Sequence, residues 1–322
     1  MTKYAILSGA AAVLLGVVLD PGVAGATSPT LARTWVSGKT GSDSNPCTRA
    51  LPCATFQTAY NATIAGGEID VLDGGEFGPV DIARDITIAN DGPGTAAITP
   101  PASGVGVNIR TATSAAVVLR GVSISGINGN VYGIDDQVEG SLVIDHCTIE
   151  GSFVGINIAR DGKLVMKDTV LSNDGAGGSF SALDIFSRNG LTTTASLERV
   201  QILNANGNGV RADSTLGRVD VDLHDVIVDG ASGGSAIVAV SQTSGGPTAT
   251  ILADHVTVTH SPGYGFKASG GTASVYLRRS VVENNGVGLG AANGGQIFSY
   301  GDNSFANNTG GPGVTPTAVP LE

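Results

Sequence analysis

A short phrase of alternating apolar residues recurs along the chain and constrains its fold more than any other feature. Each copy reads apolar-x-apolar-polar-polar-apolar-x-apolar, and the seven copies are Val117–Ile124, Leu142–Ile149, Leu164–Leu171, Ala195–Ile202, Val221–Val228, Ile251–Val258 and Val275–Val282. Their last residues follow one another at intervals of 22 to 31 residues. A repeat of this length predicts a solenoid, in which each unit buries its apolar face against its neighbours.

The alternation predicts two short strands joined by a tight polar bend, because side chains two residues apart share one face of a strand. A third strand follows a glycine-rich loop. Its successive copies are Gly133-Ile134-Asp135, Gly155-Ile156-Asn157, Ala182-Leu183-Asp184, Gly209-Val210-Arg211, Ala236-Ile237-Val238, Gly265-Phe266-Lys267 and Gly288-Leu289-Gly290. The 48 glycines and the 5% aromatic content also suit short strands and turns. We therefore expect an all-β, single-domain parallel β-helix with three strands in each coil.

The two polar positions of each bend form two columns when the coils are stacked. The first column is Arg84, Arg120, Asp145, Lys167, Glu198, His224, Asp254 and Arg278; the second is Asp85, Gly121, His146, Asp168, Arg199, Asp225, His255 and Arg279. From Asp145 onward no neighbours in a column carry like charges, as favoured by a coil spacing of about 4.8 Å. We interpret the Asp-His neighbours as a charge ladder. Catalysis or zinc binding is the alternative, but the His residues lie in non-adjacent coils or different columns, so no metal site is expected.

The N-terminus has the features of an export signal. Lys3 precedes an apolar run over residues 5–19, and Ala24-Gly25-Ala26 supplies the small residues of a cleavage site. We expect residues 1–26 to be a signal peptide and the mature protein to be periplasmic or extracellular. A retained anchor is the alternative, but the run is shorter than the roughly 20 residues needed to span a bilayer, and no other span is expected.

The three cysteines fit an exported protein. Cys47 and Cys53 lie close together in the sequence, and we expect them to form a disulfide in an oxidising compartment. Metal binding is the alternative, but no further His or Cys follows near enough to complete a site. Cys147 lies in a column of mostly apolar residues, which predicts a small buried side chain.

Taken together, these features resemble the right-handed parallel β-helices of the pectate-lyase-like superfamily. More narrowly, several segments resemble a family of secreted bacterial β-helix proteins without an established activity: Thr34-Trp35-Val36-Ser37-Gly38, Asn45–Cys53, Thr55-Phe56, Gly66-Gly67-Glu68-Ile69, Leu72–Gly78 and Gly301–Asn308. The resemblance covers nearly all of the mature chain. It implies a right-handed helix whose N-terminal end is covered by a short amphipathic helix.

This resemblance divides the mature chain into three parts. An N-terminal cap over residues 27–66 would contain the disulfide loop and a helix over Cys53–Ile64, whose apolar residues recur at helical spacing. A parallel β-helix of about nine to ten coils would follow over residues 67–311. Residues 312–322 would form an extended tail, and its prolines predict that it cannot continue a strand ladder.

Superfamily enzymes that cleave or epimerise polysaccharides bind sugar along the outward face of the third strand. In this chain that outward column is Asp135, Asn157, Asp184, Arg211, Val238, Lys267 and Gly290. Asp135 and Asp184 would lie about 9.6 Å apart, near the upper limit for an inverting pair of carboxylates. Arg211 would hold a sugar carboxylate or act as the base of a β-elimination. Asn157 and Lys267 would bind substrate; an ordinary solvated strand face is the alternative.

Several absences argue against catalysis. Of the motifs that the hydrolases of this superfamily carry, only Asp135-Asp136 is present, and Asn157 interrupts the acids that a Ca²⁺-dependent lyase requires. Tyr132 and Tyr264 are separated by five coils, so no aromatic platform is expected.

The 17 basic residues are scattered and outnumbered by 28 acidic ones, which disfavours nucleic acid as a partner.

We therefore expect an exported, monomeric protein that binds an extracellular or envelope polysaccharide along the outward column. A polysaccharide lyase, hydrolase or epimerase is one alternative, and a structural or adhesive surface rod is the other. Unequal loop lengths favour specific binding over a rod. No cofactor is expected; Ca²⁺ is compatible with the fold but has no motif in this sequence.

Overall fold

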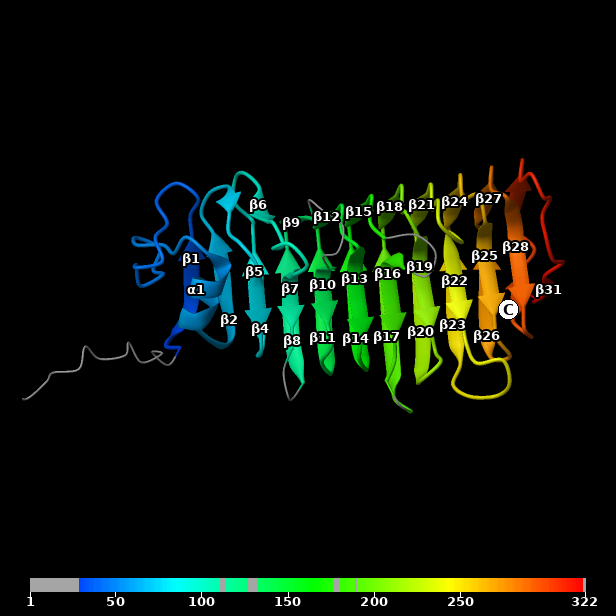
Figure 1. The fold of residues 1–322 in the computed structure, drawn as a ribbon, viewed down its shortest axis with the longest axis horizontal. Helices are drawn as coiled ribbons and strands as arrows, with labels where there is room; N and C mark the ends of the chain where they lie inside the picture. The colour runs from blue at the N-terminus through cyan, green and yellow to red at the C-terminus, as the bar shows by residue number, and fades with distance from the viewer. Residues whose placement is uncertain (1–28, 111–113, 127–131, 176–179, 189, 321–322) are drawn as a thin grey trace, which may run out of the picture.

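The computed structural model describes residues 29–110, 114–126, 132–175, 180–188 and 190–320. Its strands form three parallel sheets, here named A, B and C, which wind as a right-handed parallel β-helix. The coils stack along one long axis, with α1 near one end and β31 at the other (Figure 1). The expected all-β fold with three-strand coils and a short N-terminal helix is confirmed.

Each complete coil contributes one strand to each sheet, in the order A, B, C. Sheet A contains β1 (Leu31–Val36), β2 (Thr63–Val71), β5 (Ile86–Ala89), β8 (Ala115–Arg120), β11 (Gly140–Asp145), β14 (Gly162–Lys167), β17 (Thr192–Glu198), β20 (Arg218–His224), β23 (Ala249–Asp254), β26 (Ala273–Arg278), β29 (Gln296–Ser299) and β31 (Thr317–Ala318). Sheet B contains β3 (Gly75–Glu76), β6 (Ala96–Ile98), β9 (Val122–Ser125), β12 (Thr148–Glu150), β15 (Val170–Ser172), β18 (Gln201–Leu203), β21 (Ile227–Asp229), β24 (Thr257–Thr259), β27 (Val281–Glu283) and β30 (Ser304–Ala306). Sheet C contains β4 (Val80–Ile82), β7 (Val105–Ile109), β10 (Tyr132–Asp136), β13 (Val154–Ala159), β16 (Ser181–Phe186), β19 (Asn208–Asp213), β22 (Ile237–Val240), β25 (Tyr264–Ser269) and β28 (Val287–Ala292).

Strand register confirms the alignment of the repeats. Asp145 pairs with Lys167, which pairs with Glu198 in the next coil, as the first bend column predicts. In the second column, the residues from His146 to Arg279 have φ between 46° and 55°. This left-handed conformation turns the chain sharply from sheet A to sheet B. The bend is therefore a feature of the backbone that repeats in successive coils, and the residues at it are mostly charged or His.

The core consists of the inward residues of all three sheets. In one coil, Leu142, Ile144 and Ile149 are fully buried, and each lies in register with a buried counterpart in the next coil. Burying one such side chain contributes about 1.5–3 kcal/mol before entropy is subtracted. Cys147 is 3% exposed, as predicted for a small buried residue. Burial raises the pKa of its thiol to about 11, so the group is neutral at physiological pH.

The N-terminal helix is shorter than expected. Helix α1 spans Phe56–Ala62, and the Thr55 hydroxyl caps it by accepting a hydrogen bond from the Thr58 amide. Thr63 already has extended backbone angles and begins β2 together with Ile64. These two β-branched residues favour a strand, which is why the helix ends before them. The predicted range Cys53–Ile64 was therefore too long at both ends.

A disulfide joins Cys47 and Cys53, as expected, and both residues are buried. The Trp35 amide donates to the Cys47 carbonyl, and the Cys53 amide donates to the Trp35 carbonyl, both at 2.9 Å. The disulfide loop thus covers part of the free edge of β1. Covering an edge in this way protects a sheet from pairing with another chain.

The C-terminal tail does continue a ladder, so that expectation was wrong. Strand β31 pairs in parallel with β29, and the Val319 amide donates to the Ser299 carbonyl at 2.9 Å. Pro316 and Pro320 lie on either side of the paired residues and therefore remove no hydrogen bond from them. No helix in the described ranges is long and apolar enough to cross a bilayer. The predicted signal peptide lies outside those ranges.

Candidate functional site

The five residues singled out from the sequence lie in one outward column of sheet C. Asp135 pairs with Asn157, Asn157 with Asp184, and Asp184 with Arg211 in successive coils. Lys267 follows two coils later, after Val238. The column also extends toward the N-terminal end. We call it the sheet C column: Asp81, Asn108, Asp135, Asn157, Asp184, Arg211, Val238, Lys267 and Gly290.

Asp135 is held by polar neighbours although it points outward. Its Oδ1 accepts a hydrogen bond from Asn157 Nδ2, and its Oδ2 accepts one from Gln137 Nε2, both at 2.8 Å. Arg110 Nη2 lies 3.6 Å from the same Oδ2. The residue is only 3% exposed, so flanking groups cover this part of the column. These contacts fix the orientation of the carboxylate.

Asp184 is equally buried and has fewer partners. Burial raises the pKa of this carboxyl to about 6, and Ser181 and Arg211 partly offset the effect. Its Oδ1 lies 3.8 Å from Arg211 Nη1 and receives no hydrogen bond from the described residues. Near neutral pH, a fraction of Asp184 is therefore protonated and able to donate a proton.

The two basic residues of the column are held by neighbouring side chains. Arg211 forms an ion pair with Asp213 through Nη2, and its guanidinium lies 4.9 Å from the centre of the Phe186 ring. Its charge is therefore shared between two carboxylates, which favours binding over a role as a base. Lys267 Nζ lies 5.3 Å from the centre of the Tyr264 ring.

Three aromatic rings lie where the chain enters sheet C. The Phe153 ring is 6.4 Å from Tyr132 and 4.3 Å from Phe180, between ring centres. Burial raises the pKa of the Tyr132 phenol, and the charges of Asp135 and Asp184 raise it further. The Tyr132 phenol is thus within electrostatic reach of both carboxylates. With Phe180 39% exposed, one ring offers a substantial surface to solvent.

This aromatic cluster corrects the expectation that no platform would form. The two tyrosines alone do not reveal this cluster, because its other members, Phe153 and Phe180, lie just outside the three-residue segments by which the third strands were aligned. In the sequence, an aromatic residue lies shortly before the third strand in each of three consecutive coils, and this recurrence is the signal that predicts the cluster. Phe153 and Phe180 hold equivalent positions of adjacent coils, which are about 4.8 Å apart, and Tyr132 lies one residue out of register with Phe153 in the preceding coil.

A cavity of about 450 Å³ lies at the N-terminal end of the column. Asp81 and Asn108 line it from the column, Gln57 lines it from α1, and Pro101 lies on its wall. The volume falls within the range of about 300–1,000 Å³ that is typical of ligand pockets. Sequence reasoning missed this cavity because the helix and the two coils that enclose it are distant in the chain.

The sequence pair Asp135-Asp136 does not form a pair of carboxylates at one site. Asp136 lies in the interior, where its Oδ2 accepts a hydrogen bond from Arg160 Nε at 2.6 Å. Arg160 also donates to the carbonyl oxygens of Gly140, Asp161 and Lys163. Burial raises the pKa of Asp136 to about 6 despite the opposing effect of Arg160. This pair therefore has a structural role.

A Ca²⁺ cluster of the kind that the resemblance implies for lyases does not fit this column. Asn157 separates the two acids, both oxygens of Asp135 accept hydrogen bonds, and Asp184 faces Arg211. Ca²⁺ favours six to eight oxygen ligands. In the described ranges, the two groups of three potential metal ligands lie at bends between sheets A and B.

Comparison with known proteins shows likeness in structure only. No family model and no curated protein match the chain. A solved rhamnogalacturonan lyase matches with a TM-score of 0.51 and 11% identity, covering 83% of this chain and 75% of the lyase. Pectate lyase Pel9A matches with a TM-score of 0.52 and 12% identity, covering 89% of this chain and 77% of Pel9A. The chain therefore has the pectate-lyase-like parallel β-helix fold.

Proposed function

We propose that this protein is exported and binds a polysaccharide along the sheet C column. The observation that carries the proposal is that two nearly buried carboxylates, Asp135 and Asp184, lie within electrostatic reach of Tyr132, whose ring belongs to a cluster of three aromatic side chains. Binding sites for organic ligands combine apolar surfaces with a few fixed polar groups. The disulfide and the fold shared with two polysaccharide lyases support export and a carbohydrate ligand.

In this proposal, each part of the site has a separate task. The exposed Phe180 ring packs against a sugar face, while the less buried side chains of Asn157 and Lys267 bind hydroxyl groups and Asp135 holds the Asn157 amide in place. The cavity at Asp81 and Asn108 receives one end of the polymer. Because every charged residue in the N-terminal half of the column is an acid and the chain has a net charge of −11, neutral or amino sugars fit better than polyuronates.

One observation favours an enzyme as the second candidate. A carboxyl with a pKa of about 6 is suited to general acid catalysis near neutral pH. Asp184 would protonate the glycosidic oxygen, and Asp135 would activate a water molecule in a hydrolase. Lyase and epimerase reactions need a base in the same column. A structural or adhesive rod is the remaining alternative.

These candidates separate in one set of assays on the purified chain without residues 1–26. A glycan array measures binding, and assays of reducing ends and unsaturated products measure turnover, with and without Ca²⁺. Binding without turnover supports the proposal. Turnover would establish an enzyme, and the absence of both would favour the rod.

Variants of the column locate the site. Asp184→Asn and Arg211→Ala should each weaken glycan binding by about tenfold, the loss expected for one charge-assisted hydrogen bond. Asp222→Asn is the matched control, because it removes an exposed acid from β20 in sheet A. Equal binding by all variants and wild type would exclude this surface.

A further inference from the structure

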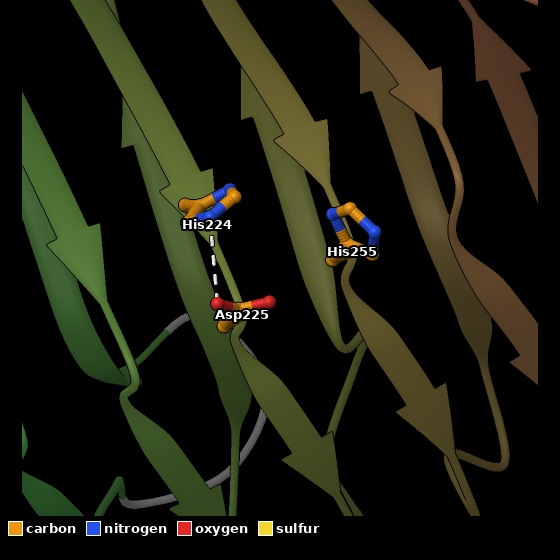
Figure 2. Close-up of side chains that lie close together, drawn as sticks. All are labelled: His224, Asp225 and His255. Atoms are coloured by element: carbon orange, nitrogen blue, oxygen red, sulfur yellow. Dashed lines mark ion pairs between the residues drawn. The ribbon is translucent and has the colours of Figure 1, made fainter.

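A second group of titratable side chains lies at the bends between sheets A and B. His224 ends β20, Asp225 follows it, and His255 lies one coil further on, just after β23. One potential ligand atom from each residue lies within 4.8 Å of the other two. Figure 2 shows His224 and Asp225 on one coil and His255 on its neighbour. The group is separate from the sheet C column.

The two histidines meet diagonally across adjacent coils. His224 pairs in register with Asp254, so His255 lies one residue beyond its direct partner. The ring centres are 5.7 Å apart and the rings are perpendicular. The expectation that different columns keep these His residues apart was therefore wrong. Both columns lie at one sharp bend, where a diagonal neighbour is within reach.

Spacing within the group suits a small divalent ion. His224 Nε2 lies 3.4 Å from Asp225 Oδ2. In a tetrahedral zinc site with bonds of about 2.0–2.1 Å, adjacent ligand atoms are about 3.3 Å apart. Asp225 and His255 both have left-handed backbone angles, with φ of 53° and 55°. The repeated conformation of the bend thus fixes the backbone from which the Asp225 and His255 side chains extend.

Asp254 lies beside both imidazoles and faces their Nδ1 atoms. Its Oδ1 lies 3.2 Å from His255 Nδ1, and its Oδ2 lies 3.8 Å from His224 Nδ1. A carboxylate facing Nδ1 favours the tautomer that leaves Nε2 free to bind a cation. Arg279 binds the same carboxylate through Nε at 2.8 Å and through Nη2. The negative charge of Asp254 therefore compensates the positive charge of the Arg279 guanidinium.

We propose that His224, Asp225 and His255 bind one divalent transition-metal ion, with Zn²⁺ as the best fit, and that Asp254 positions the nearer imidazole, that of His255. Two imidazoles and one carboxylate suit zinc better than Ca²⁺, which prefers oxygen ligands. The three side chains are between 44% and 51% exposed. Solvent therefore has access to a fourth position on the ion.

The similar group Asp145, His146 and Asp168 serves as an internal comparison. Arg199 donates to both oxygens of Asp168, at 2.7 and 2.8 Å, and His146 Nδ1 lies 2.7 Å from Asp145 Oδ1. The guanidinium occupies the carboxylate that a metal would need. With a single imidazole, this group should bind Zn²⁺ much more weakly.

Zinc titration of the purified protein, prepared without a polyhistidine tag, tests the proposal. Calorimetry should show one strong site per chain. His224→Gln and His255→Asn should weaken binding at least tenfold, and Asp254→Asn by about 10- to 100-fold. Asn is chosen at position 255 because it tolerates a left-handed backbone. His260→Asn and His146→Asn, at positions with the same left-handed backbone, are matched controls and should bind like wild type.

The imidazole NMR signals of the wild-type protein provide a test that does not depend on variants. The chain has four histidines, and one equivalent of Zn²⁺ should shift the signals of His224 and His255 alone. Absence of a saturable site, loss of binding in His146→Asn, or shifts confined to the other two histidines would overturn the proposal. Glycan binding is measured separately, so failure here leaves the sheet C proposal standing.

Discussion

At the residue scale, Asp174 is the most unusual polar group in the interior. It is fully buried; its Oδ1 accepts a hydrogen bond from the Ser152 amide at 2.8 Å, while its Oδ2 has no partner among the described residues. Asn285 has the equivalent role later in the helix, accepting from the Ser261 amide and donating to the Val258 carbonyl. At this position a side-chain amide can both accept a hydrogen bond from a backbone amide and donate one to a backbone carbonyl, whereas the ionised carboxylate of Asp174 can only accept.

We predict that Asp174→Asn stabilises the protein at pH 7 by about 1–3 kcal/mol, the cost of a buried unsatisfied polar group. Burial raises the pKa of Asp174 well above its ordinary value. The contribution of Asp174 to wild-type stability therefore falls as the pH rises above the unfolded pKa of about 3.9, because the unfolded state loses its proton first. The free energy of unfolding in urea at pH 7 and pH 4 should show the gain shrinking at pH 4.

The reverse substitution, Asn285→Asp, is the matched control. It should destabilise the protein at pH 7 and have a smaller effect at pH 4. An Asp174→Asn gain that is the same at both pH values would contradict the assignment of a buried neutral carboxyl.

A second prediction concerns the buried ion pair. Arg160→Ala should cost about 3–5 kcal/mol in the free energy of unfolding, because it leaves the Asp136 carboxylate buried without its partner. Arg218→Ala removes an exposed pair with Asp220 and should cost less than about 1 kcal/mol. Chemical unfolding of both variants tests this difference, and equal costs would refute a structural role for the buried pair.

At the scale of elements, the left-handed residues define where each strand ends. Asn204 follows β18 with a φ of 53°, and Gly230 occupies the equivalent place after β21. Asn and Gly accept this conformation more readily than other residues. The same conformation explains why an asparagine also directly follows three other sheet B strands, at Asn173, Asn284 and Asn307.

Asn204→Gly should change stability little, whereas Asn204→Val should destabilise the protein by about 1–2 kcal/mol because a β-branched residue resists a positive φ. Thermal unfolding of the two variants measures the difference. Similar melting temperatures would show that the turn adapts to either residue.

Much of the fold was predictable from the sequence because its determinants are local. Alternation over eight residues places Leu142 and Ile149 inward, and bend charges such as Asp145 and Lys167 fix the register between coils. The failures involve contacts between coils or competition between elements. The end of α1 depends on Thr63 joining sheet A, and the β31 ladder depends on which tail amides remain free.

The candidate site was predictable only in part for the same reason. The sheet C column followed from register, which aligned Asp135, Asn157 and Asp184. Aromatic residues in loops of variable length, such as Phe153 and Phe180, have no fixed place in a repeat alignment. The proximity of two bend columns is likewise a property of backbone curvature, which the spacing of residues does not reveal.

At the scale of the whole molecule, the two ends of the β-helix are the places where a strand edge of another chain could pair with it. Strand β31 covers part of β29, where the Phe298 ring stacks on Tyr276 with centres 4.6 Å apart. Removing residues 312–322 should expose this edge and promote association, because an open strand edge pairs with other chains. Light scattering of the truncated chain measures this.

Adding Phe298→Lys to the truncated chain is the control for this prediction. A charge on the exposed edge should restore the monomer if edge pairing causes the association. A truncated chain that stays monomeric at all concentrations would show that β31 has no protective role.

The most direct test of the central claim is a calorimetric titration with a glycan that the array identifies as a ligand. Wild type is compared with Phe180→Ala and Asp184→Asn in the sheet C site, and with Tyr276→Ala on sheet A as control. We predict at least tenfold weaker binding for the two sheet C variants and unchanged binding for the control. Equal affinities for all four proteins, or a loss confined to Tyr276→Ala, would contradict the assignment of sheet C as the polysaccharide-binding surface.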